Sequence, residues 1–258
     1  MDKKDIATRF SRYAKFYDSF SDIQREICLQ LINEIKVEPQ DILEIGCGTG
    51  FYTKLLKERF PASKIVSLDI SEEMVKIARK SVRESLFFVA DGEETGIKRR
   101  FDLITGSSCF QWFFNLRESL FQYKGILKKS GKILFSIFGN DTFQELREIV
   151  GMPSGLILKN DLTEIMKEFN GSLREERRVE EYPSLFFLLK KIKYSGEGMK
   201  IRDGLWTKSV IENLEEAYKS RFGKIIATYQ IFFCKCFLQG ARKHKGSGYA
   251  RTKRKNIK

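Results

Sequence analysis

Three glycines at alternating positions follow a short apolar run early in the chain. Gly46, Gly48 and Gly50 lie in the segment DILEIGCGTGFY (residues 41–52), directly before a stretch with the periodicity of an amphipathic helix. Glycine at the end of a strand lets a ligand approach the backbone closely. Alternatively, it permits a tight turn that serves packing alone. The spacing is G-x-G-x-G and not G-x-G-x-x-G, which weakens the interpretation as a dinucleotide site.

Acidic residues accompany the ends of three expected strands. Glu44 lies inside the first strand, Asp69 ends the second and Asp91 follows the third. In an open α/β fold the carboxyl ends of the strands meet at the edge where ligands bind, and a carboxylate there can accept both hydroxyls of a ribose. The alternative is that the acids only cap helices, which explains Asp91 acceptably but not all three together.

The chain has one histidine, His244, inside a basic C-terminal segment. Catalysis by Ser-His-Asp or Cys-His groups and metal sites built on histidine therefore have no credible histidine, and no metal is expected. The cysteines are odd in number and irregularly spaced, which fits neither a disulfide framework nor a zinc site. We expect most of them to be buried, inert thiols in a reducing cytoplasm. They are Cys28, Cys47, Cys109, Cys234 and Cys236.

The elements that would position these residues alternate between strand and helix. Strands are expected at residues 41–45, 64–69, 86–90, 101–106 and 132–138. Helices are expected at residues 51–60, 72–82 and 115–127, with a turn at 128–131. This order predicts a doubly wound α/β fold, with a mostly parallel sheet covered by helices through right-handed crossovers.

Helices dominate before and after this alternating region. The N-terminal residues 5–35 are expected to be helical with a break at 17–21, and Ser21 with Gln24 predicts a capping box. Thr142 with Glu145 predicts a second capping box. Later helices are expected at residues 141–150, 162–169, 184–194 and 208–222. A weakly alternating edge strand at 173–182 and a β-rich run at 225–237 suit a mixed sheet with an antiparallel strand.

Composition favours one domain. The chain has 258 residues, 42% of them hydrophobic, and no long linker rich in Pro, Ser or Gly. We expect one domain at residues 1–240, with a helical cap at 1–36 and a basic tail at 241–258. No apolar run is long enough for a transmembrane helix, and the N-terminus has no secretory signal. The formal net charge of +13 fits an acidic partner, either a protein or nucleic acid, or merely a solubilising tail.

The glycine loop and the three acids resemble the motifs of class I S-adenosylmethionine-dependent methyltransferases. LEIGCGTG is similar to their first motif, LDIS to the second and ADGEE to the third, in matching order and spacing. The resemblance implies a seven-stranded Rossmann-like sheet and S-adenosylmethionine as cofactor. It implies that the glycine loop approaches the methionine and ribose portions and that Asp69 holds the ribose hydroxyls. The implied cofactor-binding residues are Glu44, Gly46, Cys47, Gly48, Gly50, Asp69, Ile70, Met74, Asp91, Gly92 and Ser107.

In this assignment Ile70 and Met74 flank the adenine, and Asp91 with Gly92 meets its amino edge. A narrower resemblance covers nearly the whole chain up to about Gln239. The segments IATRFSRYAKFYDSFSDIQREI, CFQWFFNL and FSIFGNDTFQELREI are similar to the malonyl-acyl-carrier-protein O-methyltransferases of biotin synthesis. The final ATYQIFFCKCF departs from the usual residues there, and the basic tail has no counterpart in the pattern.

This narrower resemblance implies a malonyl thioester on acyl carrier protein or coenzyme A as methyl acceptor. Its free carboxylate is ionised at neutral pH, so the reaction needs alignment and desolvation but no general base. We expect Tyr17 to close over the methyl group, and Gln111 and Trp112 to form the wall of the acceptor site. The alternative is that Trp112 only packs under a lid.

A cation is expected to hold the acceptor carboxylate, preferably an arginine with its bidentate fork. Arg147 is the first candidate, with Arg9 and Arg12 in reserve, although a solvated helix face explains Arg147 equally simply. Lys190, Lys191 and Lys193 fit a basic rim that attracts the acidic carrier protein, although a solvated helix face explains them equally well. The sequence leaves two other functions open, a methyltransferase for RNA or another small carboxylic acid, and a non-catalytic S-adenosylmethionine-binding assembly protein. No RNA-binding module is evident, so nucleic acid is the less favoured partner.

Overall fold

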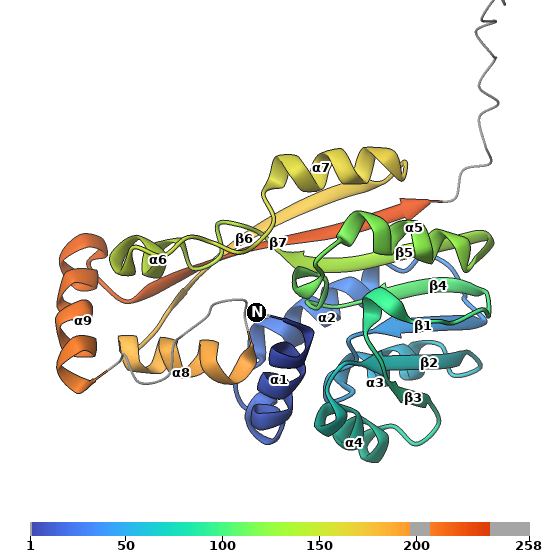
Figure 1. The fold of residues 1–258 in the computed structure, drawn as a ribbon, viewed down its shortest axis with the longest axis horizontal. Helices are drawn as coiled ribbons and strands as arrows, with labels where there is room; N and C mark the ends of the chain where they lie inside the picture. The colour runs from blue at the N-terminus through green and yellow to red at the C-terminus, as the bar shows by residue number, and fades with distance from the viewer. Residues whose placement is uncertain (1, 197–206, 238–258) are drawn as a thin grey trace, which may run out of the picture.

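The computed structural model describes residues 2–196 and 207–237, and a seven-stranded sheet runs through them (Figure 1). The strand order is β3-β2-β1-β4-β5-β7-β6. The strands are β1 Asp41–Ile45, β2 Lys64–Asp69, β3 Leu86–Val89, β4 Phe101–Gly106, β5 Leu127–Phe138, β6 Ser172–Glu181 and β7 Ile226–Phe237. The first five are parallel, whereas β7 runs antiparallel to β5 and to β6. The predicted fold class, including the late antiparallel strand and the edge strand, is confirmed.

Nine α-helices and two short 3₁₀ helices occur among the described residues. The α-helices are α1 Lys3–Tyr17, α2 Asp22–Glu34, α3 Phe51–Arg59, α4 Glu72–Ser81, α5 Leu116–Gly125, α6 Gln144–Val150, α7 Lys159–Glu168, α8 Leu185–Ser195 and α9 Lys208–Phe222. The 3₁₀ helices are η1 Gly92–Glu94 and η2 Phe110–Trp112. The break between α1 and α2 falls where the sequence predicts it. The predicted tail at residues 241–258, with His244, lies outside the described residues.

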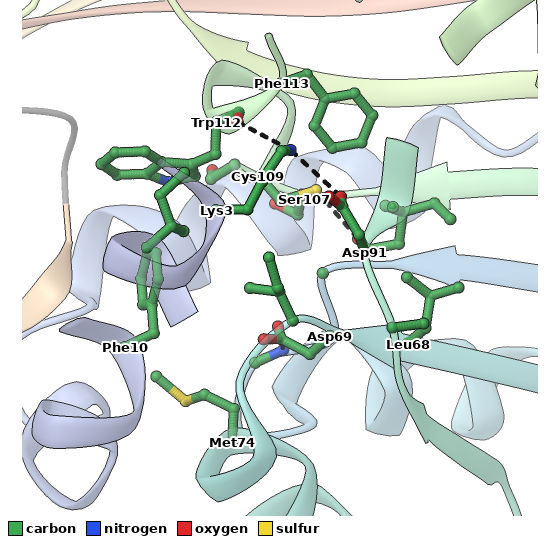
Figure 2. Close-up of a pocket in the computed structure, with 18 of the residues that line it drawn as sticks. Lys3, Phe10, Leu68, Asp69, Met74, Asp91, Ser107, Cys109, Trp112 and Phe113 are labelled. Atoms are coloured by element: carbon green, nitrogen blue, oxygen red, sulfur yellow. Dashed lines mark hydrogen bonds and ion pairs between the residues drawn. The ribbon is translucent and has the colours of Figure 1, made fainter. Parts of the chain in front are cut away.

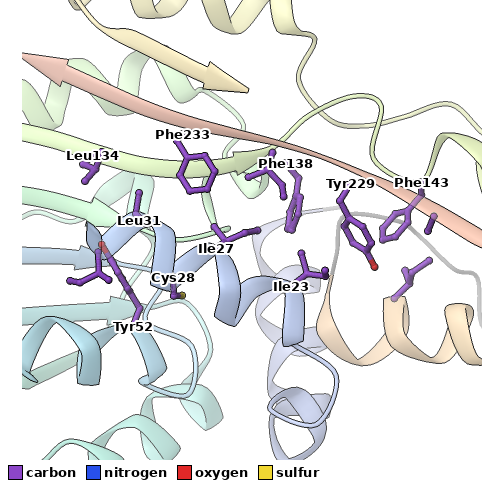
Figure 3. Close-up of a cluster of buried hydrophobic side chains, with 14 of the residues drawn as sticks. Ile23, Ile27, Cys28, Leu31, Tyr52, Leu134, Phe138, Phe143, Tyr229 and Phe233 are labelled. Atoms are coloured by element: carbon purple, nitrogen blue, oxygen red, sulfur yellow. The ribbon is translucent and has the colours of Figure 1, made fainter. Parts of the chain in front are cut away.

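Hydrophobic side chains are buried on both faces of the sheet. Ile42 and Leu43 are successive residues of β1, and they enter two different buried clusters because successive side chains of a strand point to opposite faces. On one face α2 packs across the central strands through residues such as Ile27 and Leu31 (Figure 3). This packing fixes α2, and with it the turn from α1, beside the edge where the parallel strands end.

Two local predictions near the fifth strand are wrong because contacts with neighbouring strands replace the local interactions that were expected. Thr142 and Glu145 form no capping box, since α6 begins at Gln144 and both side chains bind β7. The Glu145 carboxylate accepts from the backbone N–H of Thr228 at 2.9 Å, and the Thr142 hydroxyl bonds the backbone of Gln230. The turn predicted at 128–131 is instead an irregular first part of β5, where the pairing with β4 shifts register.

The capping box predicted at the start of α2 is also wrong, although the helix begins where expected. Ser21 occupies the N-cap position, but its side chain makes no capping hydrogen bond. All five cysteines are free thiols, and four of them are buried, as expected. In the part of the chain that the structure describes, no helix has the length and apolar character needed to cross a membrane.

Candidate active site

The glycine loop connects β1 to α3 in a conformation that requires glycine. Gly46, Gly48 and Gly50 have φ angles of +69°, +54° and +92°. A Cβ atom at Gly46 would lie 2.4 Å from Cβ of Cys109, whereas one at Gly48 would meet no atom within 4 Å. Gly46 therefore serves tight packing, and Gly48 leaves its backbone open to the space beside the loop.

A cleft of about 640 Å³, counted with its open mouth, lies at the carboxyl edge of the sheet (Figure 2). The structure brings ten of the predicted site residues together in its lining. They are Tyr17, Gly46, Gly48, Asp69, Ile70, Met74, Asp91, Gly92, Ser107 and Trp112.

Asp69 is held rigidly at the end of β2. One carboxylate oxygen accepts from the backbone N–H of Ser71 at 2.8 Å, and the other accepts from the N–H of Gly48 at 2.9 Å. Burial raises the pKa of Asp69, while these two hydrogen bonds oppose the rise. An ionised carboxylate has about four acceptor positions, so two amide partners leave capacity for two hydroxyl donors. The geometry fits a ribose diol.

A second cavity of about 390 Å³ adjoins the cleft at the glycine loop. Both cavities are lined by Tyr17, Gly46, Gly48 and Ser107. Cys47 lines the second cavity and not the cleft, so its predicted contact with the cofactor would come from that cavity. The two cavities therefore meet at these four residues, one of which is Tyr17.

Arg25 of α2 lines the second cavity, and sequence reasoning missed it. Its guanidinium lies over the ring of Phe51 at 4.8 Å and pairs with Asp18 at 3.6 Å. Nε of Arg25 is buried and has no hydrogen-bond partner among the described residues. A buried unsatisfied N–H costs free energy, so this geometry favours an anionic ligand next to the glycine loop. In the sequence, Arg25 looks like any other arginine on an amphipathic helix.

Lys3 is a second site residue that the sequence did not reveal. Its ammonium group pairs with Asp91 at 3.2 Å (Figure 2). It also pairs with Glu93 and lies 4.8 Å from the ring centre of Phe114. Ile6, from the same helix α1, also lines the cleft. The Asp91 carboxylate binds Lys3 and would also accept a hydrogen bond from an amino group of a ligand.

Gln111 and Trp112 occupy different positions in the turn after β4. Trp112 lines the cleft, and its ring lies edge-on to Phe10 at 5.6 Å. This position is compatible with both interpretations of Trp112, as a wall of the acceptor site and as a residue packed under a lid. Gln111 lies outside the lining of both cavities and donates to the carbonyl of Ser108 at 2.6 Å. Nε1 of Trp112 and Oε1 of Gln111 are buried without a hydrogen-bond partner among the described residues.

Glu44 and Gly50 support the loop from behind and do not line either cavity. One oxygen of the Glu44 carboxylate accepts from the hydroxyls of Thr53 and Ser67, both at 2.6 Å. Gly50 caps α3, where a Cβ atom would lie 3.1 Å from Cα of Ala78. We therefore correct their assignment from contact with the cofactor to positioning of the loop.

Glu44 makes the free energy of unfolding depend on pH. Burial raises its pKa from 4.5 to about 7, so the folded protein keeps a proton that the unfolded chain loses. This stabilisation is complete below pH 4.5 and is lost as the pH rises through 7. Between about pH 5 and 8 we expect the free energy of unfolding of the wild type to fall by on the order of 2 kcal/mol relative to that of Glu44→Gln. Urea unfolding at the two pH values measures this change. If the free energies of unfolding of the two proteins differed by the same amount at both pH values, this assignment would be wrong.

The three predicted arginines all lie outside the lining of the two cavities. Arg147 donates to the carbonyls of Asn140 and Thr142, because the loop before α6 exposes these groups to its guanidinium. Its role as acceptor cation stays a prediction without geometric support. Arg12 is exposed on α1. Of the three, Arg9 lies nearest the acceptor segment, 6.0 Å from the ring centre of Trp112, and it also donates to the carbonyl of Ile192.

Within residues 2–196 and 207–237, no group of His, Cys, Asp and Glu side chains has the arrangement of a metal site. The titratable groups that line the cleft are Lys3, Tyr17, Asp69, Asp91 and Cys109. Burial raises the pKa of Cys109 well above that of an ordinary thiol, so it stays protonated at neutral pH. The site can hold and orient charged reactants, and the described residues that line it include no imidazole to remove a proton.

Comparisons with known proteins agree with this geometry. A family model described as a methyltransferase domain matches residues 43–135. The chain is 34% identical to malonyl-[acyl-carrier protein] O-methyltransferase 2 of Ilyobacter polytropus over 237 residues, which cover 86% of this chain and 92% of that protein. It is 41% identical to malonyl-[acyl-carrier protein] O-methyltransferase of Priestia megaterium over 152 residues, which cover 57% of this chain and about half, 56%, of that protein.

Solved structures show the same fold at low sequence identity. The YcgJ protein of Bacillus subtilis superposes with a TM-score of 0.60 at 13% identity, over 84% of this chain and 99% of that chain. Phosphoethanolamine N-methyltransferase 2 of Haemonchus contortus, in complex with S-adenosylhomocysteine, gives a TM-score of 0.57 at 18% identity, over 93% of this chain and 61% of that chain. The predicted class I methyltransferase fold is confirmed.

Proposed function

Because this chain belongs to the family of malonyl-[acyl-carrier protein] O-methyltransferases, we propose that it methylates the free carboxylate of a malonyl thioester carried by acyl carrier protein. The methyl donor is S-adenosylmethionine. The product is a malonyl methyl ester, which is expected to prime synthesis of the pimeloyl precursor of biotin. The observation that carries the proposal is the pair of adjoining cavities, which have a fixed carboxylate at Asp69, a guanidinium at Arg25 whose Nε is buried and, among the described residues, no imidazole in their lining.

The described residues fit S-adenosylmethionine along the whole length of the site. Asp69 would accept the ribose hydroxyls, and Ile70 with Met74 would flank the adenine in the cleft. Arg25 would hold the carboxylate of the methionine portion in the second cavity, where its Nε has no other hydrogen-bond partner among the described residues. When bound, the cofactor supplies an electrophilic methyl group on a sulfonium sulfur.

The residues at the junction would align the acceptor carboxylate with that methyl group. Tyr17 lines both cavities and belongs to the helix that covers the cleft, so its ring would exclude water where the two reactants meet. Trp112 would form the wall on the acceptor side, with its buried indole N–H as a donor for the acceptor. Arg9, beside Trp112, is the best placed of the three predicted arginines to approach the acceptor carboxylate.

A panel of acceptors tests this function. We expect labelled methyl transfer to malonyl-acyl carrier protein and none to the malonamyl analogue, which replaces the carboxylate by an amide. Because the carboxylate is ionised well below neutral pH, the rate should be nearly constant between about pH 6 and 8. A rate that rises through a pKa near neutrality in both the wild type and Glu44→Gln, where the Glu44 carboxyl cannot titrate, would show a general base and contradict the mechanism. Transfer to bulk RNA in place of the malonyl thioester would contradict the substrate assignment.

A further inference from the structure

Two helices beside the mouth of the cleft carry a large part of the positive charge. α1 contains five Lys or Arg residues and one Asp, and α8 contains three lysines and no acidic residue. Lys3 is bound by Asp91 and Glu93, and Lys191 is buried and pairs with Asp22 at 3.6 Å. Lys191 is therefore not part of the rim that the sequence predicts. Lys4, Arg12, Lys15 and Lys190 are exposed.

A cluster of aromatic rings joins these two helices. Tyr194 of α8 contacts Tyr13, Phe16 and Phe20, with ring centres 4.9–5.2 Å apart. Phe16 is 50% exposed, and the ammonium group of Lys190 lies 5.5 Å from the ring centre of Phe20. Lys193 stands in the same way over Tyr13. An apolar centre bordered by charged side chains is the usual anatomy of a protein–protein interface.

This surface lies on the flank of α1 that faces α8, next to the side of the same helix that lines the cleft. Ile6, Phe10 and Tyr17 of α1 face the cleft, while Tyr13 and Phe16 face α8. In Figure 1 the two helices lie side by side, on the side of the molecule opposite to α7. A helix is about 10 Å across, so a partner bound here would be within reach of the acceptor side of the cleft.

We propose that the outer surface of α1 and α8 docks the acidic carrier protein that presents the malonyl thioester, an inference that rests on the proposed function. The excess of positive charge on both helices favours an acidic partner and fast, salt-sensitive association. The arrangement of the aromatic rings favours a protein partner over a nucleic acid. Phe20 and Tyr194 stack on each other with an interplanar angle of 29°, so their contacting faces are closed to the bases that a nucleic acid would stack there.

Charge reversal at the two lysines that border the rings tests the docking surface. In the double variant Lys190→Glu/Lys193→Glu, we expect KM for malonyl-acyl carrier protein to rise about tenfold with little change in kcat. KM for malonyl-pantetheine, which has the thioester and the carboxylate but no protein, should stay the same. The matched control is Lys98→Glu/Lys129→Glu, because these lysines are exposed but lie near the amino ends of β4 and β5. The control should leave both KM values unchanged.

The dissociation constant of the carrier protein, measured by fluorescence anisotropy, should follow the same pattern. Equal KM values for the carrier substrate in the two double variants would overturn the proposal. So would an equal rise in KM for malonyl-pantetheine, because the lysines would then act on the cleft itself. Displacement of carrier protein by RNA from the wild type would assign the surface to nucleic acid instead. If the wild type methylates neither substrate, the proposed function fails, and the anisotropy measurement still decides the docking surface.

Discussion

Replacement of Asp69 by alanine is expected to raise the dissociation constant for S-adenosylmethionine by about 100-fold. The carboxylate would accept two ribose hydroxyls in a buried position, and hydrogen bonds to a charged group contribute about 1.5–3 kcal/mol each. It also orders the glycine loop through the N–H of Gly48, so the variant loses part of the preformed site. Isothermal titration calorimetry on the folded variant measures the effect.

Asp102 provides the matched control for this prediction. It also accepts from two backbone N–H groups, those of Gln40 and Asp41, at 3.0 and 2.9 Å, but it lies near the amino end of β4, away from the cleft. Asp102→Ala should therefore reduce stability without changing cofactor affinity. If both variants weaken binding equally, the loss reflects general destabilisation, and the ribose assignment of Asp69 is wrong.

Replacement of Arg25 by methionine is expected to raise the same dissociation constant by roughly 30- to 100-fold. Methionine keeps much of the side-chain volume against Phe51 but removes the cation that would bind the methionine carboxylate. KM for the malonyl substrate should change little at saturating cofactor. Calorimetry and steady-state kinetics on one preparation separate these two quantities.

Arg99→Met is the control, because Arg99 also stands over a phenylalanine ring and pairs with an aspartate. It lies 5.8 Å from the ring centre of Phe101 and binds Asp41, at the start of β4 and β1. This variant should bind the cofactor like the wild type. A rise in acceptor KM with unchanged cofactor affinity in Arg25→Met would instead make Arg25 the cation for the acceptor carboxylate.

The sheet and its ligand edge could be predicted because their signals are local. Short apolar runs separated by amphipathic helices fix a parallel α/β sheet, and this topology brings the ends of β1, β2 and β3 together. Asp69 and Asp91 then reach one cleft from positions 22 residues apart in the chain. The glycine spacing locates the loop, although it does not separate Gly48, open to the cleft, from Gly50, which packs on Ala78.

The cations of the site could not be predicted in the same way, because their positions depend on tertiary contacts. Arg25 and Arg147 are both arginines on amphipathic helices, yet one lines a cavity and the other binds loop carbonyls. Lys3 binds Asp91 although the two residues are 88 positions apart in the sequence. The failed capping box at Thr142 and Glu145 has the same origin, since β7 arrives late in the sequence and bonds both side chains.

The most direct test of the central claim is to identify the product formed by the purified wild-type protein from S-adenosylmethionine and malonyl-acyl carrier protein. Mass spectrometry of the carrier should show one added methylene unit on the malonyl group. Mild base should release the methyl group as methanol, as expected of an ester. Cofactor binding without any methylated malonyl group would contradict the account, leaving the fold and the cofactor cleft in place but assigning the site to another acceptor.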